Sequence, residues 1–165
     1  MFAVAQAAIA GPLEDGEAAR QRGDTAAALK LWLPLARQGN AEAQARAATL
    51  YSGLRAPEYA EALRWNRLAA RQGHPEAQAN LAALYEGGLG MPRDYVRAYM
   101  WRSVWSARLK GENASSSLIL KDMLARRMTP AQVGEAKALA AACVKSGYTT
   151  CGEPEGAQAP PARNP

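Results

Sequence analysis

The feature that most constrains this chain is an internal repeat with a period of 34 residues. Residues 28–51 and 62–85, aligned at that offset, are identical at 13 of 24 positions, and both contain the motifs Arg-Gln-Gly and Glu-Ala-Gln-Ala. A period of this length is typical of a solenoid of helix pairs, because one pair is too small to bury its own apolar face and must stack on its neighbours. The repeat therefore predicts a helical array.

The residues of one repeat predict a hairpin of two helices. A first helix is expected over residues 76–86, where apolar residues recur at spacings of three and four and so share one side. His74-Pro75 precedes this helix and Gly87-Gly88 follows it, in keeping with the preference for proline at the first helical position and for glycine at the C-terminal cap. A second helix, rich in tyrosine and tryptophan, is expected from residue 95 to about residue 109.

These motifs resemble a known repeat family. The residues that carry the resemblance are Trp65, Ala69-Ala70-Arg71-Gln72-Gly73-His74, Glu76-Ala77-Gln78, Leu81, Tyr85 and Gly88-Leu89-Gly90-Met91-Pro92-Arg93-Asp94. Together they resemble the Sel-1-like repeat, a branch of the tetratricopeptide-like α-solenoids. The resemblance implies an all-α, right-handed α-α superhelix of about eight helices in antiparallel pairs, without strands.

The resemblance covers residues 62–101 most fully and residues 24–51 less so. The loop after Tyr51 is two residues shorter than the loop after Tyr85, and Ala82 stands where the family usually has glycine. After Trp105 the pattern stretches, so the third unit is degenerate.

Two pairs of aromatic residues occupy equivalent places in successive units. Trp65 corresponds to Trp101, and Tyr51 corresponds to Tyr85. We expect all four side chains to be largely buried between helices.

The array is expected to occupy residues 11–151 and to end in a capping helix, since Thr129-Pro130-Ala131-Gln132 forms a capping box. Residues 1–10 are small and apolar and end in Ala-Ile-Ala, like the cleavage site of a secretory signal peptide, but they lack its positively charged start. A frayed helix is the alternative. Residues 152–165 have no apolar periodicity and are expected to be disordered. No stretch approaches the ~20 apolar residues of a membrane span.

The basic residues are not evenly distributed. Residues 93–127 contain eight basic and three acidic residues, which accounts for the whole net charge of +5, because the rest of the chain holds twelve of each. The excess is either a solvated helix face or a patch for an acidic protein segment, an anionic lipid or a nucleic acid. No nucleic acid partner is expected, because an extended basic track is missing.

Little in the sequence points to catalysis. His74 is the only histidine and the chain has two cysteines, so neither a zinc tetrad nor a Ser-His-Asp triad can be assembled. We interpret His74 as a helix cap. We therefore expect no catalytic residue, no metal and no cofactor, and we do not expect an enzyme.

The resemblance implies a protein–protein interaction scaffold, here expected in the bacterial cell envelope, whose partner is another protein. One alternative is a secreted hydrolase, because some relatives carry a β-lactamase-like label, although the missing catalytic residues argue against it. Another alternative is an envelope module that binds glycan or anionic lipid.

The candidate partner-binding positions lie opposite Leu81, which is taken as the centre of the buried side of its helix, at about 100° per residue. In tetratricopeptide-like arrays the first helix of each pair lines the inner curve. By resemblance, these positions and their equivalents one repeat earlier should form the floor of a groove. The alternative is an exposed alanine-rich face without a partner. The predicted residues are Glu42, Ala45, Arg46, Thr49, Ser52, Glu76, Ala79, Asn80, Ala83 and Glu86.

The two cysteines are expected to form a disulfide. The last helix should stop near Ser146-Gly147, so that the chain folds back and brings Cys143 and Cys151 within the ~4.4–6.8 Å between Cα atoms that a disulfide needs. Secreted relatives of the family also carry cysteine pairs at this spacing. A disulfide would agree with a periplasmic or secreted protein, and two free thiols in a cytoplasmic protein are the alternative.

Overall fold

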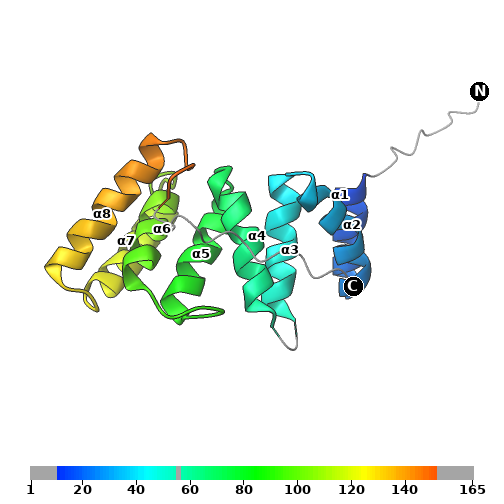
Figure 1. Cartoon of the computed structure of the whole chain (residues 1–165), viewed down its shortest axis with the longest axis horizontal. Helices are drawn as coiled ribbons and strands as arrows, with labels where there is room; N and C mark the ends of the chain where they lie inside the picture. The colour runs from blue at the N-terminus through cyan, green and yellow to red at the C-terminus, as the bar shows by residue number, and fades with distance from the viewer. Residues whose placement is uncertain (1–10, 55–56, 152–165) are drawn as a thin grey trace, which may run out of the picture.

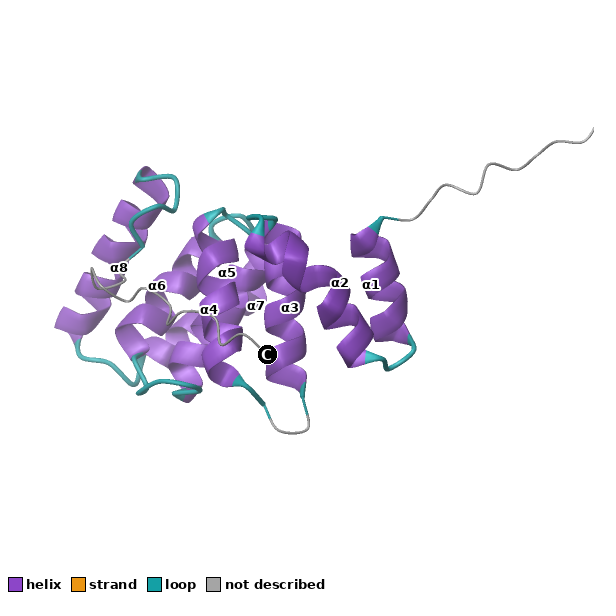
Figure 2. Ribbon diagram, turned by 45° about the vertical axis from the view of Figure 1, so that its right-hand side comes forward, coloured by secondary structure: helices purple, strands orange, loops and turns teal. Residues whose placement is uncertain are grey.

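The computed structural model describes residues 11–54 and 57–151 (Figure 1). Within these ranges the regular structure consists of eight helices, and no strand is found (Figure 2). The predicted signal segment at residues 1–10 and the predicted tail at residues 152–165 lie outside the described residues. The helices are α1 (Pro12–Gln21), α2 (Thr25–Arg37), α3 (Ala41–Gly53), α4 (Tyr59–Arg71), α5 (Pro75–Gly87), α6 (Tyr95–Ser106), α7 (Glu112–Ala125) and α8 (Pro130–Lys145).

From α1 to α7, consecutive helices pack side by side and follow one another along the long axis of the molecule (Figure 1). The helices α1 to α6 form three hairpins, and α3 also contacts α5 directly. The all-α repeat array that the sequence predicts is thereby confirmed. Its far end is different, because α7 and α8 both pack on α6.

Polar side chains cap the N-termini of several of these helices. Asp24, Asn40, Asp94 and Thr129 each accept a hydrogen bond from a backbone N–H in the first turn of the helix that follows. Such caps satisfy N–H groups that have no partner inside the helix. The capping box predicted at Thr129 is present, since the Gln132 side chain also accepts from the Thr129 N–H at 2.8 Å.

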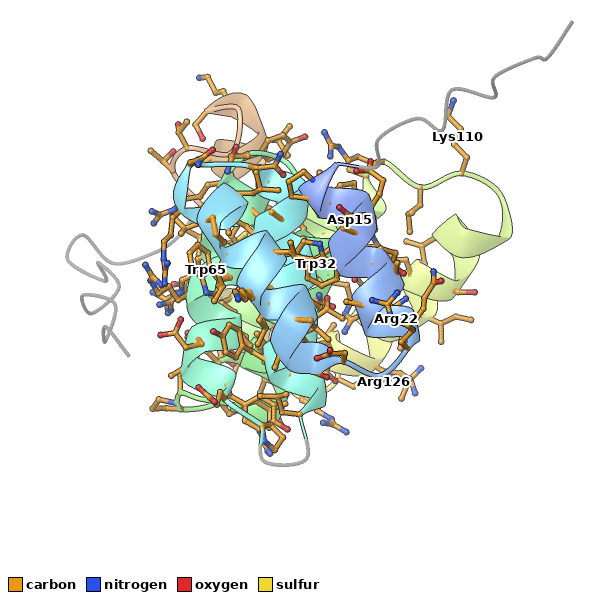
Figure 3. The ribbon with its side chains drawn as sticks, turned by 90° about the vertical axis from the view of Figure 1, so that its right-hand side faces the viewer. Asp15, Arg22, Trp32, Trp65, Lys110 and Arg126 are labelled. Carbon is orange, nitrogen blue, oxygen red and sulfur yellow. A yellow bond between two sulfur atoms is a disulfide. The ribbon has the colours of Figure 1, made fainter. Side chains whose placement is uncertain are left out.

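The core follows the array and is built around tryptophan. Trp32 and Trp65 belong to a cluster formed by α1 to α4, and Trp101 belongs to a second cluster that extends to α8. Trp65 and Trp101 are buried as predicted, and so is Tyr85. Figure 3 shows Trp32 between α1 and α2.

Tyr51 is only partly buried and packs against the edge of the first cluster, so it is less enclosed than Tyr85. Leu89 and Met91, in the loop after Tyr85, pack against the cluster that contains Tyr85. The loop after Tyr51 has two residues fewer, and so less chain is available to cover this ring.

The predicted disulfide is present between Cys143 and Cys151, whose Cα atoms are 4.4 Å apart. It joins α8 to the turn that follows, in which the Tyr148 N–H donates to the Cys143 carbonyl at 2.8 Å. The Tyr148 ring lies 5.0 Å from the Arg108 guanidinium, and Arg108 donates to the Gly73 carbonyl at 2.6 Å. The turn therefore contacts the end of α6 and the loop between α4 and α5.

Candidate functional site

The candidate site is the face formed by the first helices of the three hairpins, α1, α3 and α5, called the first-helix face below. A chain of charged side chains crosses it. Arg46 on α3 donates to Glu17 on α1 at 2.7 Å and to Glu42 on its own helix at 2.6 Å. The other Glu42 oxygen lies 2.9 Å from His74 Nε2, at the start of α5. Three successive repeats are thus linked by one polar chain.

His74 has a second contact that determines the tautomer of its neutral ring. Its Nδ1 accepts from the Ala77 N–H at 3.4 Å and so caps α5, as the sequence predicts. Because Nδ1 accepts, the neutral ring carries its proton on Nε2 and donates it to Glu42. His74 therefore joins the cap of one helix to the carboxylate of the previous repeat.

A second polar chain runs beside the first. The Thr49 hydroxyl donates to Glu76 at 3.0 Å, and Asn80 Nδ2 lies 3.5 Å from the Thr49 hydroxyl and 3.4 Å from Asn66 Oδ1. Asn66 is fully buried, and its own Nδ2 has no hydrogen-bond partner within the described residues. This part of the face consequently presents hydrogen-bonding groups backed by a buried amide.

Two carboxylates of the face are held in the ionised form. The pKa of Glu17 is lowered to about 2, first by the hydrogen bond from Arg20 and then by Gln21 and the charges of Arg20 and Arg46, against an opposing desolvation. The pKa of Glu42 is lowered chiefly by its hydrogen bond with His74. Both groups carry a full negative charge at neutral pH.

A hollow of about 350 Å³ opens between α1 and α3. Its walls carry three carboxylates and one guanidinium, and Leu13 and Ala18 supply an apolar part. The hollow includes two of the residues predicted from the sequence, Glu42 and Arg46. It is lined by Leu13, Glu14, Glu17, Ala18, Gln21, Glu42 and Arg46.

The other predicted residues differ in their exposure and contacts. Thr49 and Ala83 are exposed, as a binding face requires, and Ala79 is half-buried. Glu86 forms an ion pair with Arg102 on α6, with 2.9 Å between the nitrogen and the oxygen. Ala45 is only 1% exposed, so its side chain cannot line a surface. The expectation fails there because α5 packs directly on α3 and covers it.

Sequence reasoning did not find the contribution of α1. Glu14 and Glu17 lie in the first helix, where the link to the next helix is short and the 34-residue offset no longer aligns residues. The acidic first turn of α1, with Glu14 and Asp15, was the available signal. A carboxylate on α1 facing an arginine on α3 could not be derived from it.

Among the described residues, no three His, Cys, Asp or Glu side chains gather closely enough to hold a metal ion. None of the described helices combines the length and apolar character needed to cross a membrane.

The family follows from comparison with known proteins. The model of the Sel1 repeat matches residues 3–40, 41–74 and 75–101, which is more than half of the chain. The chain belongs to the Sel1 repeat family. The second and third matches begin where α3 and α5 begin, so each repeat is one of the hairpins described above.

A solved structure agrees with this fold. The crystal structure of a protective antigen present in uropathogenic Escherichia coli strains, which displays an SLR fold, superposes with a TM-score of 0.72 at 20% sequence identity. The alignment covers 93% of this chain and 34% of the antigen, so this Sel1 repeat protein spans about a third of the antigen's length. At this identity the likeness concerns the fold alone. No curated protein matches the sequence.

Proposed function

We propose that this Sel1 repeat protein is a scaffold of the bacterial cell envelope that binds a segment of a partner protein on its first-helix face. Sel1 repeat proteins generally act in protein–protein interaction. The observation that carries the proposal is the hollow between α1 and α3, beside which the Thr49 hydroxyl connects α3 to Glu76 of α5. Extended grooves of stacked repeats are binding surfaces in solenoids of this kind.

The first-helix face can make contacts of three kinds. The hollow offers a small apolar surface at Leu13 and Ala18 beside carboxylates, which suits the stem and cationic head of a lysine or arginine. Thr49 and Asn80 offer hydrogen bonds for the backbone of an extended segment. Ala79 and Ala83 leave room for that backbone, because alanine projects only one methyl group.

The envelope location is supported by the disulfide. Cys143 and Cys151 are both buried and bonded to one another. Disulfides persist in the periplasm and outside the cell and are rare where thiols are kept reduced. The partner is therefore expected to be a periplasmic or secreted protein, or the outward part of a membrane protein.

The test is site-specific photo-crosslinking in the native cell. A photoreactive residue at Thr49 or at Ala83, both exposed on the first-helix face, should give one discrete adduct whose partner is identified by mass spectrometry. The same residue at Ala60, which is exposed on α4, is the control and should give no such adduct. Equal adducts from all three positions would mean that the first-helix face has no special role.

A matched pair of variants then measures affinity with the purified partner. Ala83→Arg places a long charged side chain on the first-helix face without removing a native contact, and Ala60→Arg makes the same change on α4. We expect only Ala83→Arg to weaken binding, with melting temperatures unchanged. Arg46→Glu is not a clean test, since Arg46 joins α1 to α3.

A further inference from the structure

Helix α7 has an unusual surface. Within the described residues, four of the six large apolar side chains that are exposed belong to this one helix. We call them the α7 ridge: Leu118, Ile119, Leu120 and Met123, which are 60%, 63%, 42% and 53% exposed. A soluble domain rarely leaves so many apolar side chains together in water unless something covers them.

Two residues of the ridge, Ile119 and Met123, lie on the side of α7 that faces away from α6, and Leu118 and Leu120 lie on its two flanks. Ser117 and Leu124 are each 1% exposed, and Lys121 between them lies 5.6 Å from the Tyr99 ring of α6. These residues share one side of the helix, since they are separated by four and three positions. Ile119 and Met123 consequently point outward.

Cations surround the ridge. Lys110 precedes α7 and Arg126 and Arg127 follow it, and Figure 3 shows Lys110 and Arg126 beyond the two ends of the yellow-green helix. Asp122 on the outward side is neutralised by an ion pair with Arg126 at 2.9 Å. Arg127, together with Arg93, lies over the Tyr95 ring, and among the described side chains neither arginine has a carboxylate partner.

We propose that the α7 ridge docks on the surface of an anionic lipid bilayer, with Ile119 and Met123 in the interface and the surrounding cations at the headgroups. Exposed apolar side chains on a helix flanked by lysine or arginine residues can enter such an interface, where burial of apolar area and attraction to anionic lipids both favour binding. Anionic headgroups attract each nearby cation, and the attraction decreases with salt. The inference is independent of the protein partner proposed above.

The shape of the ridge favours a bilayer over a folded partner. Leu118, Ile119 and Leu120 are consecutive, so their side chains leave the helix in directions about 100° apart. One rigid groove would have to wrap around the helix to contact all three, whereas a fluid interface closes around any protruding shape. In Figure 3, α7 extends beyond the outline of the helices in front of it.

The test is flotation of the full chain with lipid vesicles. We expect binding to vesicles of equimolar phosphatidylglycerol and phosphatidylcholine, little binding to phosphatidylcholine alone, and release as salt is added. The double variant Ile119→Ser/Met123→Ser should lower the partition coefficient about tenfold or more, because it removes apolar groups from the interface. Lys110→Gln/Arg127→Gln should lower it about fivefold per removed charge.

The control variant is Leu68→Ser/Arg71→Gln, which removes one exposed apolar side chain and one exposed cation from α4. It should bind the anionic vesicles like the wild type. Circular dichroism melts of all variants establish that each is folded. The proposal would be overturned if the wild-type protein bound neither kind of vesicle. It would also be overturned if the Ile119→Ser/Met123→Ser protein bound the anionic vesicles as well as the wild type does. So would size-exclusion data in which this variant turns a dimer into a monomer, because a second copy would then cover the ridge.

Discussion

The indole of Trp32 lies directly against the backbone of Gly16, so closely that a Cβ atom on Gly16 would be 2.2 Å from Trp32 Nε1. The same indole N–H donates to the Leu13 carbonyl at 3.1 Å. Trp32 is completely buried and belongs to the core cluster of α1 to α4. Glycine at position 16 is therefore what allows α1, and with it one wall of the hollow, to pack on α2.

We predict that Gly16→Ala destabilises the protein by about 1–3 kcal/mol, the usual cost of forcing extra volume into a packed site. The matched control is Gly134→Ala on α8, where a Cβ would meet no heavy atom within 4 Å. That change should stabilise the protein by about 0.5–1 kcal/mol, because alanine is the better helix former. Denaturant unfolding of both variants checks the pair. A Gly16→Ala protein as stable as Gly134→Ala would contradict the packing described for α1.

A second prediction concerns the loss of stability at acid pH. The pKa values of Glu17 and Glu42 are lowered in the folded protein, that of Glu17 to about 2. Their contribution to stability is therefore fully present above the unfolded pKa of about 4.3 and is lost as pH falls through the lowered pKa of each group, which is about 2 for Glu17. Glu42→Gln keeps the shape but removes the charge, so it should lose less stability than the wild type between neutral and acid pH.

The acid prediction is measured by melting temperatures at neutral pH and at a pH below the unfolded value of the glutamates. Glu135→Gln, on the exposed side of α8, is the control and should follow the wild type. If Glu42→Gln and the wild type lose stability in parallel on acidification, then the Glu42 contacts with Arg46 and His74 do not hold the repeats together.

The third prediction tests the repeat register. Trp65 is 2% exposed, and the Arg64 guanidinium lies 4.4 Å from its ring. Trp65→Ala should cost about 3–5 kcal/mol, as truncation of a large buried aromatic side chain usually does. Leu68→Ala, one turn later on the exposed side of α4, should change stability far less. A Trp65→Ala protein that melts like the wild type would refute the assignment of Trp65 to the core.

The repeat predicts the hairpins and most of the core, because Trp65 and Trp101 stand at equivalent places in successive units and both are buried. Positions that depend on the next unit are less predictable. Ala45 and Ala79 are equivalent in sequence, yet Ala45 is buried by α5, whereas Ala79 is half-buried because α7 packs on α6 instead. The stretched pattern after Trp105 indicates that the third unit differs, but it does not show which helix α7 packs on.

In the candidate site, too, some residues were predictable from the sequence and others were not. Glu42, Arg46, Thr49 and Asn80 were placed on one face by helical periodicity, and hydrogen bonds connect them there. Their binding role stays a prediction. Glu17 was not predicted to belong to the site, because its contact with Arg46 joins two different helices that are 29 residues apart in sequence. The exposure of the α7 ridge was not predicted either, because an apolar run such as Leu118-Ile119-Leu120 looks the same in sequence whether it is buried or exposed.

The last prediction concerns the disulfide of Cys143 and Cys151. Protein purified from its native compartment under alkylating conditions should carry no alkylated cysteine, since the two sulfurs are bonded and both residues are buried. Replacing both cysteines by alanine should cost about 2–3 kcal/mol in the chain-entropy model for so short a loop. The loss should be local at first, because the bond holds the turn whose Tyr148 ring lies on Arg108. Hydrogen exchange should thus accelerate at the end of α8 before it changes in α1 to α5. Two alkylated cysteines in the native protein would remove both the bond and the support it gives to an envelope location.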